Sequence, residues 1–573
     1  MHSLLLYAYK NYTHKNMKRK NMLHAVLMAF ACCSPLTAQP TTLTTQQSTS
    51  LSSTATTHAV QRPKLVVGIV VDQMRWDYLY RYQNRYTEGG FKRLLNEGFS
   101  CENTAIPYVP SVTAIGHSCI YTGSVPSIHG IAGNNFMKNG KKVYCTDDDM
   151  VQPVGTTSNA GLMSPRNLWT TTLGDEMKIA SNGRAKVVGV ALKDRASILP
   201  AGHNPNGAYW FDDATGNFIT SSYYTNKLPR WVENFNSKKL AAHYLAEKWN
   251  TLYPKTTYAE STADNNNYEN GIKQGVAPTL PLNLPELYKK YGYNIIRNTP
   301  FGNSLTFDMA KAAIEGEQLG VDNETDLLAV SCSSTDYIGH QVGTHAIETE
   351  DTYLRLDQSL ADFLTYLDAK VGKGNYLVFL TADHGAMNNA QFLKDRRIPA
   401  GSWDADEVCQ KLNQTLAHSF MGATNLVKTV MNYQVFLDHK AIGEHHLDYD
   451  KIKQMVIDAL QQDSCVLYAC DMEHVATQAI PQEVKFRIVN GYNRERSGDI
   501  AVVLKPNFYA HGMKGTDHGA WNAYDTHIPL VFMGWGVAHG ATTQRTFMTD
   551  IAPTIAALLH IQAPNGSVGK PIF

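Results

Sequence analysis

Three aspartates at the ends of apolar runs are the residues of this sequence best placed to do chemistry. Asp72 ends KLVVGIVVD, Asp336 ends DLLAVSCSSTD, and Asp383 lies in NYLVFLTADHG. Such runs predict buried parallel strands, whose carboxyl ends meet at the edge of a sheet where ligands bind. One such aspartate alone could simply cap a helix. Three together would repel one another, so the set predicts bound cations.

Histidines accompany these aspartates at short spacings. His340 follows the second aspartate by four residues, and His384 directly follows the third in the first of two DHGA motifs. His518 belongs to the second DHGA motif, whose flanks differ from those of the first, so the two copies are not an internal repeat. Imidazole and carboxylate together are zinc-type ligands. Most of the 21 histidines must be bystanders, and His511 is a weaker alternative to His518.

A hydroxyl nucleophile is offered by the stretch VPSVTAIGH at residues 109–117. Pro110 disfavours helix at Val109, so a helix can begin just after the proline. The Thr113 hydroxyl would then face the backbone N–H groups of the helix N-terminus, a site suited to an anion. Equally, Ser111 or Thr113 could merely cap that helix. The pattern alone leaves both interpretations open.

A Lys-x-Arg pair, Lys193 and Arg195, ends the apolar run AKVVGVALKDR. Residues two apart on a strand face the same side, so this run predicts two cations that point in one direction. Arg195 can bind phosphate oxygens with two parallel hydrogen bonds, and Lys193 supplies a point charge. Without the other residues, such a pair is usually a solvated strand edge.

Taken in order along the chain, these residues resemble the metal and nucleophile set of the alkaline phosphatase superfamily. The likeness covers residues 64 to 573 and is closest to the phosphate-irrepressible alkaline phosphatases with a threonine nucleophile. It extends to the related nucleotide pyrophosphatase/phosphodiesterase family. Those phosphatases carry an Asn after the nucleophile, matched here by Asn134 with Asn135 as the alternative, and a Lys-x-Arg pair.

The resemblance implies two zinc ions and a phosphate clamp. The implied ligands are Asp336, His340 and His518 for one zinc, and Asp72, Asp383, His384 and the Thr113 oxygen for the other. Asn134, Lys193 and Arg195 would bind the substrate phosphate, and Lys193 would occupy space where some relatives hold magnesium. Asp517 is expected beside the ligands or facing solvent. Two zinc ions would activate the threonine hydroxyl and support hydrolysis of a phosphothreonine intermediate.

The expected activity is hydrolysis of phosphate monoesters. Two cations suit a terminal dianion, whereas a diester carries one negative charge and a bulky substituent. A phosphodiesterase or nucleotide pyrophosphatase is the alternative, and an exported binding protein without turnover is less expected. A sulfatase is disfavoured because the sequence has no Cys-x-Pro-x-Arg stretch. The expected partners are small phosphorylated metabolites, with inorganic phosphate as product.

The elements that must position these residues predict an α/β fold. The expected strands are 64–72, 185–195, 326–336, 375–385 and 526–537. The expected helices are 91–98, 171–183, 305–317, 347–371 and 550–560. Continuous apolar strands that alternate with helices indicate a mostly parallel central sheet flanked by helices. Segments 136–165, 200–300 and 386–515 break this pattern and are expected to be insertions or a cap.

The N-terminus predicts export. Residues 18–20 are basic, an apolar stretch covers residues 22–33, and residues 1–38 are therefore expected to be a signal peptide. Cys32 or Cys33 could carry a lipid anchor. Residues 39–60 read as a disordered linker before a catalytic domain at 61–573. The expected location is the periplasm.

Composition limits the partners and the cross-links. The formal net charge is zero, which argues against nucleic acid or an anionic membrane as the main partner. No transmembrane helix is expected in the mature chain, which we expect to be a monomer. Seven scattered cysteines remain beyond residue 38, too few and too irregular for a disulfide scaffold, although export would permit one or two bridges.

Overall fold

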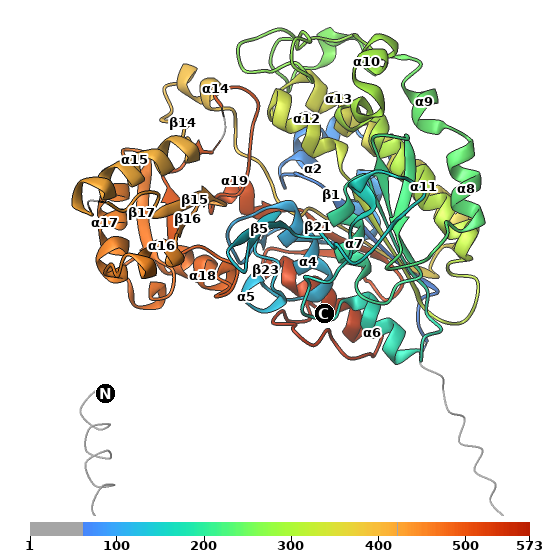
Figure 1. Cartoon of the computed structure of the whole chain (residues 1–573). Coiled ribbons are helices and arrows are strands. Elements are labelled where there is room, and N and C mark those ends of the chain that lie inside the picture. Colours follow the sequence, from blue (N-terminus) through green and yellow to red (C-terminus); the bar gives the residue numbers. More distant parts are fainter. Residues whose placement is uncertain (1–60, 421, 511) are drawn as a thin grey trace, which may run out of the picture. The chain divides into compact units, whose positions relative to one another are not determined.

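The computed structural model describes residues 61–420, 422–510 and 512–573 (Figure 1). The predicted signal peptide, the lipid-anchor cysteines and the linker lie outside the described residues, as does His511. Among the helices that are described, none is long and apolar enough to cross a membrane. All seven cysteines of this part of the chain are free thiols.

A ten-stranded mixed sheet forms the centre of the molecule (Figure 1). Its parallel part is built from β13 (Tyr376–Thr381), β1 (Leu65–Val71), β12 (Asp326–Cys332), β7 (Val187–Ala191) and β8 (Gly207–Asp212) in that spatial order. Every residue of these five strands is buried, because helices cover both faces. The α/β class and the mostly parallel sheet expected from the apolar runs are confirmed.

One predicted strand runs against the expected direction. The strand expected at 526–537 is β21 (Leu530–Gly534), which pairs antiparallel with β13 and with the short strand β2 (Phe99–Cys101). Residues just before β21 already lie at the carboxyl edge of the parallel strands, where Gly385 N donates to the carbonyl oxygen of Asp525. A strand that starts at this edge can only run away from it.

Helices pack on the two faces of the sheet in separate groups (Figure 1). One group contains α11 (Phe301–Glu317) and α13 (Ile347–Leu367), which pack on each other. The other contains α4 (Thr113–Thr122), α6 (Leu173–Ala180) and α20 (Ile551–Leu558). The helix expected at 347–371 is α13 with a short continuation, and its apolar side chains from Leu356 to Leu367 are buried.

Residues 403–504 form an inserted lobe with its own apolar core. Its sheet is antiparallel, with the order β15 (Val427–Met431), β16 (Gln434–Leu437), β18 (Ile500–Leu504) and β17 (Val466–Asp471). Helices α15 (Ala405–Ser419) and α17 (Tyr449–Gln461) complete this core. The lobe lies within the segment 386–515 that the sequence sets apart.

The other two unusual segments contribute hairpins. The β4 (Asn135–Lys138) and β5 (Lys141–Tyr144) strands form an isolated two-stranded hairpin at the start of segment 136–165. Within segment 200–300, β8 pairs antiparallel with β9 (Asn217–Ser221). Part of that segment therefore extends the central sheet instead of covering it.

Candidate metal centre and nucleophile

Asp72, Asp383 and His384 form one group of metal-capable side chains at the carboxyl edge of the sheet. Asp72 follows β1, and the other two follow its neighbour β13. His384 Nε2 lies 3.5 Å from Asp72 Oδ1 and 3.5 Å from Asp383 Oδ2. All three side chains are fully buried, so their charges are not screened by water.

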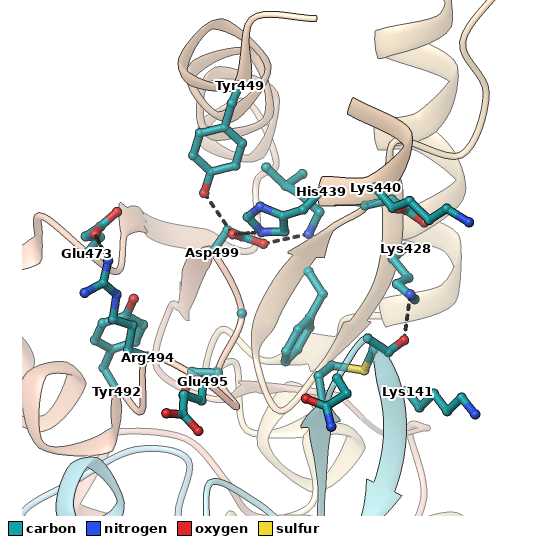
Figure 2. A pocket seen from close by; sticks show the side chains of 18 of the residues that line it. Lys141, Lys428, His439, Lys440, Tyr449, Glu473, Tyr492, Arg494, Glu495 and Asp499 are labelled. Atoms are coloured by element: carbon teal, nitrogen blue, oxygen red, sulfur yellow. Dashed lines mark hydrogen bonds and ion pairs between the residues drawn. The ribbon is translucent and has the colours of Figure 1, made fainter. Parts of the chain in front are cut away.

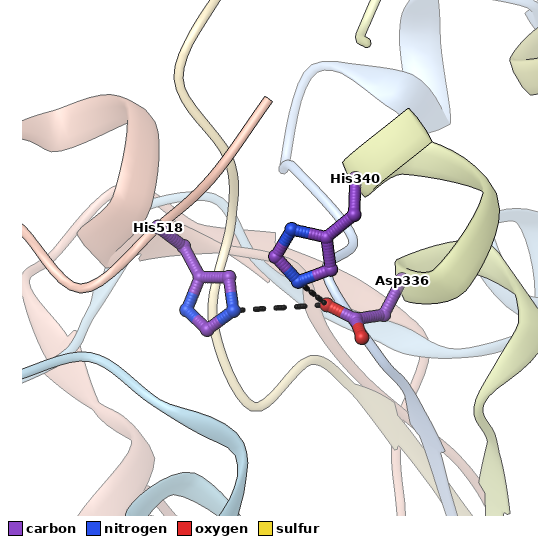
Figure 3. Close-up of side chains that lie close together, drawn as sticks. All are labelled: Asp336, His340 and His518. Atoms are coloured by element: carbon purple, nitrogen blue, oxygen red, sulfur yellow. Dashed lines mark ion pairs between the residues drawn. The ribbon is translucent and has the colours of Figure 1, made fainter. Parts of the chain in front are cut away.

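Asp336, His340 and His518 form a second such group (Figure 3). Asp336 Oδ1 lies 3.1 Å from His340 Nε2 and 3.7 Å from His518 Nε2. Asp336 does not end a strand, because β12 stops at Cys332 and α12 (Ser334–Val342) begins two residues later. The first turn of this helix therefore carries Asp336, and the next turn places His340 on the same face.

The two groups are adjacent. The rings of His384, from the first group, and His518, from the second, stack with their centroids 3.5 Å apart and their planes 12° from parallel. The sequence brings these groups together from four separate segments, because strands β1, β12 and β13 are neighbours in the sheet.

All three histidines present the same nitrogen to the carboxylates. In each ring, Nδ1 faces a backbone carbonyl oxygen instead. His340 faces Thr516 at 3.0 Å, His384 faces Gly385 at 3.0 Å, and His518 faces Ser111 at 2.7 Å. A carbonyl only accepts, so Nδ1 carries a proton in each ring, and Nε2 is the nitrogen that faces the carboxylates. This second hydrogen bond is how proteins fix a histidine as a metal ligand.

The residues present fit two bound cations. Asp72 Oδ1 and Asp383 Oδ2 are buried and receive no hydrogen bond from any described residue. Nε2 atoms and carboxylate oxygens converge in each group, and bound cations would neutralise the clustered carboxylates. Burial and the neighbouring Asp383 raise the pKa of the Asp72 carboxyl well above its ordinary value, in spite of Lys193. Carboxylate and imidazole ligands in groups of three match a zinc-type site.

Lys193 lies between the two groups. Its Nζ is 2.6 Å from Asp72 Oδ2 and 2.6 Å from Asp336 Oδ2, one carboxylate of each group. Burial alone would lower the pKa of this ammonium group, but Asp336 and Asp72 raise it above its ordinary value. Lys193 therefore stays charged and offsets part of the repulsion between the carboxylates.

Lys193 and Arg195 are not two residues of one strand face. Strand β7 ends at Ala191, Lys193 is the N-cap residue of α7 (Asp194–Ala201), and Arg195 lies in the first turn of that helix. The period-two prediction was wrong because the strand ends before the pair. Arg195 Nη1 donates to the Tyr144 hydroxyl at 2.9 Å, and its buried Nε has no acceptor among the described residues.

Thr113 is the first residue of α4, and its Oγ1 lies 3.5 Å from His384 Nε2. No described side chain at the N-cap position caps this helix, and the Ser111 hydroxyl donates elsewhere, to the carbonyl of Ala520. The capping interpretation of the threonine is therefore not supported. Instead Asn134 Oδ1 accepts a hydrogen bond from the Ala114 N–H at 2.9 Å, which places Asn134 beside the threonine.

Gln73 bridges the two groups, a role that the sequence analysis missed. Its backbone N–H donates to Asp383 Oδ1 at 3.2 Å, and its side-chain Nε2 donates to Asp336 Oδ1 at 2.9 Å. Its φ of 63° lets the chain turn directly after Asp72. Its position next to Asp72 was the only signal in the sequence.

His117 is a second missed residue, one helical turn after Thr113. It is fully buried, with Nδ1 2.9 Å from the Thr113 carbonyl oxygen and Nε2 2.9 Å from the Ser331 hydroxyl. Its Nδ1 also lies 3.3 Å from Asp383 Oδ2. The ring therefore connects the start of α4 to the metal-capable groups.

The two DHGA motifs are joined through one residue, Asp525. Its carbonyl accepts the N–H of Gly385 at 2.8 Å, and its carboxylate accepts the N–H of Ala520 at 2.7 Å. Within the second motif, Asp517 accepts the N–H of His518 at 2.9 Å and lies 3.7 Å from His340 Nδ1. Asp517 thus lies beside the ligand-type residues, one of the two expected positions.

Comparison with known proteins agrees with this geometry. The family model described as type I phosphodiesterase / nucleotide pyrophosphatase matches residues 66–529. Alkaline phosphatase PafA of Elizabethkingia meningoseptica is 54% identical over 522 residues, covering 90% of this chain and 95% of that protein. Alkaline phosphatase PhoV of Synechococcus elongatus is 53% identical over 515 residues, covering 90% and 93%. The crystal structure of wild-type PafA superposes with a TM-score of 0.88 over 90% of this chain and 99% of that chain.

Removing one ligand should remove one metal ion. Purified protein is expected to carry about two metal ions per chain, and His518→Ala should lower this to about one, measured by elemental analysis after dialysis. His439→Ala is the matched control, because His439 is an exposed histidine that bonds only Asp499 of the inserted lobe. Equal metal content in the two variants would contradict the assignment of His518.

Proposed function

This chain belongs to the type I phosphodiesterase / nucleotide pyrophosphatase family, within the alkaline phosphatase superfamily, and on that premise we propose that it hydrolyses phosphate monoesters. The proposal includes zinc as the metal and a phosphothreonine intermediate. It is supported by extensive identity to two alkaline phosphatases. The observation that carries it is a threonine hydroxyl beside two buried Asp/His groups, with Lys193 and Arg195 close by.

Two zinc ions would be held by the two groups described above. The proposed ligands are Asp336, His340 and His518 for one ion, and Asp72, Asp383, His384 and the Thr113 oxygen for the other. Bound there, zinc would supply Lewis acidity, which lowers the pKa of the hydroxyl and of water and stabilises the leaving oxygen. Lys193 would hold the place of a third cation, since it already neutralises one carboxylate of each group.

The proposed reaction has two displacement steps on phosphorus. The Thr113 oxygen forms a bond to phosphorus while the bond from phosphorus to the alcohol oxygen breaks. The alcohol leaves with a proton, and the phosphoryl group stays on Thr113. Water then attacks phosphorus, the bond to the threonine oxygen breaks, and inorganic phosphate is released. The buried position of Thr113 at the start of α4 would restrict the directions from which its oxygen can attack.

Asn134, Lys193 and Arg195 would bind the non-bridging phosphoryl oxygens. Two of the three N–H groups of Lys193 are taken by Asp72 and Asp336, which leaves one for the substrate. The Arg195 Nε–H is buried and has no acceptor among the described residues, a deficit that a phosphoryl oxygen would remove. Two cations favour a dianionic monoester over a singly charged diester. A phosphodiesterase remains the alternative, and a non-catalytic binding protein is disfavoured by the presence of the nucleophile.

We further propose that the protein is exported to the periplasm and acts there on small phosphorylated metabolites as a monomer. The support is the basic residues 18–20 followed by the apolar stretch 22–33.

Thr113→Ala should abolish the covalent intermediate and leave metal binding largely intact. Wild type quenched at low pH after exposure to labelled substrate should contain phosphothreonine, and the variant should contain none. Thr113→Ser is the control, because it keeps the hydroxyl and should retain substantial activity. Label on any other residue would move the nucleophile elsewhere.

Arg195→Ala should impair monoester hydrolysis more than diester hydrolysis. Loss of one charge-assisted contact made in the transition state should cost about 2–4 kcal/mol, or roughly 30- to 1,000-fold in kcat/KM for phenyl phosphate. The value of kcat/KM for the methyl phenyl diester should fall much less, so the preference for the monoester over the diester becomes smaller. Arg166→Ala, which removes a partly exposed arginine that pairs with Asp148 and Asp149, is the matched control. A wild type that prefers the diester would refute the monoesterase proposal.

Lys193→Ala is a less selective variant than the sequence alone suggests. Because Lys193 bonds Asp72 and Asp336, its removal also takes a positive charge from between the two groups. We therefore expect it to change metal binding as well as phosphate binding, whereas Arg195→Ala should leave the metal content unchanged.

A further inference from the structure

The tip of the β15–β16 hairpin in the inserted lobe has an unusual backbone. Asn432 and Tyr433 form the two-residue turn between the strands, and both are left-handed, with φ of 56° and 58°. Turns of this type favour Asn followed by Gly, because any side chain at the second position crowds the backbone. A tyrosine at a glycine position is unfavourable for the turn itself, so its side chain must have another use.

Tyr433 contacts the segment that carries His518. Its hydroxyl accepts a hydrogen bond from the Ala510 N–H at 3.1 Å and lies 3.5 Å from the His518 carbonyl oxygen. Its ring lies so close to Gly519 that a Cβ there would be 2.8 Å from the ring. Trp403 stacks with the Tyr433 ring, with the two ring centroids 6.3 Å apart. The ring therefore limits where the backbone next to His518 can move.

Asn432 contacts the segment that carries Asn134. Its Nδ2 donates to the Asn135 carbonyl oxygen at 2.8 Å, and a Cβ on Gly133 would lie 2.4 Å from the same nitrogen. The amide of Asn432 thus fits against the residues on both sides of Asn134.

The β4–β5 hairpin links this contact to Arg195. The Cys145 N–H donates to the Asn134 carbonyl at 3.0 Å, and Tyr144, at the end of β5, accepts the hydrogen bond of Arg195. The open end of this hairpin, here called the hairpin base, therefore contains both Asn134 and Tyr144, the partner of Arg195. Asn432 bonds to the hairpin base through Asn135.

We propose that Asn432 and Tyr433 are positioning residues, through which the inserted lobe sets the phosphate clamp and the metal ligand His518 separately. Asn432 acts on phosphate binding through Asn134, and Tyr433 acts on metal binding through His518. The part of the inference that concerns Asn432 and phosphate rests on the proposed function. The part that concerns Tyr433 and metal binding can be measured without turnover.

A matched control comes from another contact between the same two elements. Lys428 of β15 donates to the Gly140 carbonyl at 2.7 Å, at the far end of the β4–β5 hairpin from Asn134. Lys428 and Gly140 both line a cavity of about 860 Å³ that has residues of the lobe and of the hairpin in its wall, and Figure 2 shows the bond made by Lys428. Lys428→Ala removes a lobe–hairpin contact without touching the hairpin base, so it should leave phosphate and zinc affinity unchanged.

Glycine substitutions isolate the two side chains, because glycine tolerates the left-handed turn. Asn432→Gly should raise the inhibition constant of inorganic phosphate and the KM roughly tenfold, with unchanged zinc content. Tyr433→Gly should weaken zinc binding roughly tenfold or more in competition with a chelator, with unchanged phosphate inhibition at saturating zinc. A purely structural role would instead change both properties together in each variant.

Different results would overturn the positioning roles and the proposed function. Either variant behaving like Lys428→Ala, or both variants losing phosphate and zinc affinity together, would overturn the inference. If Tyr433→Gly does not fold, as judged by circular dichroism, Tyr433→Phe removes only the hydroxyl, and zinc affinity equal to wild type would count against Tyr433. A wild type that binds zinc but hydrolyses no phosphate ester would refute the proposed function and leave the zinc measurement on Tyr433 valid.

Discussion

Repulsion among three buried carboxylates is the constraint on which the rest of the site depends. Asp72, Asp336 and Asp383 converge at one edge of the sheet, out of contact with water. Lys193 offsets one negative charge, and the Nδ1 atom of His518 is held by the Ser111 carbonyl, which turns its Nε2 toward Asp336. Bound cations would supply further positive charge at this edge. The carbonyl oxygens orient the histidines toward the carboxylates. Gln73 donates a further hydrogen bond to one of those carboxylates, Asp336.

The sequence predicted the parts of this arrangement that depend on local pattern. Continuous apolar runs predicted β1, β12 and β13, and residues that follow those strands are the acidic ones. The prediction for Lys193 and Arg195 was wrong because a strand boundary moved by a few residues. Residues two apart face the same side only within a strand, and β7 ends at Ala191, before Lys193, the N-cap residue of a helix. The direction of β21 was likewise set by where the preceding loop lies, which no local pattern contains.

Contacts between distant segments could not be predicted where the residues belong to no recognisable metal-ligand pattern. Gln73 reaches Asp336 across 263 positions of sequence, and Asn432 reaches Asn135 across 297. Neither residue belongs to a motif, and amides of this kind are common on protein surfaces. His117 was visible as a residue one turn after Thr113, but its bond to Ser331 depends on how α4 packs against the sheet. The ligand-type residues were recognisable because their chemistry is rare in combination.

The order in which the chain supplies the two groups has a consequence for biosynthesis. Asp72, Asp383 and His384 are all present once residue 384 has been made, whereas the second group waits for His518, beyond the whole inserted lobe. The same late segment brings β21, which closes the sheet against β13. A chain truncated before His518 therefore lacks one ligand of the second group and cannot complete the pair. Chemistry that requires both groups is therefore withheld until His518 has been made.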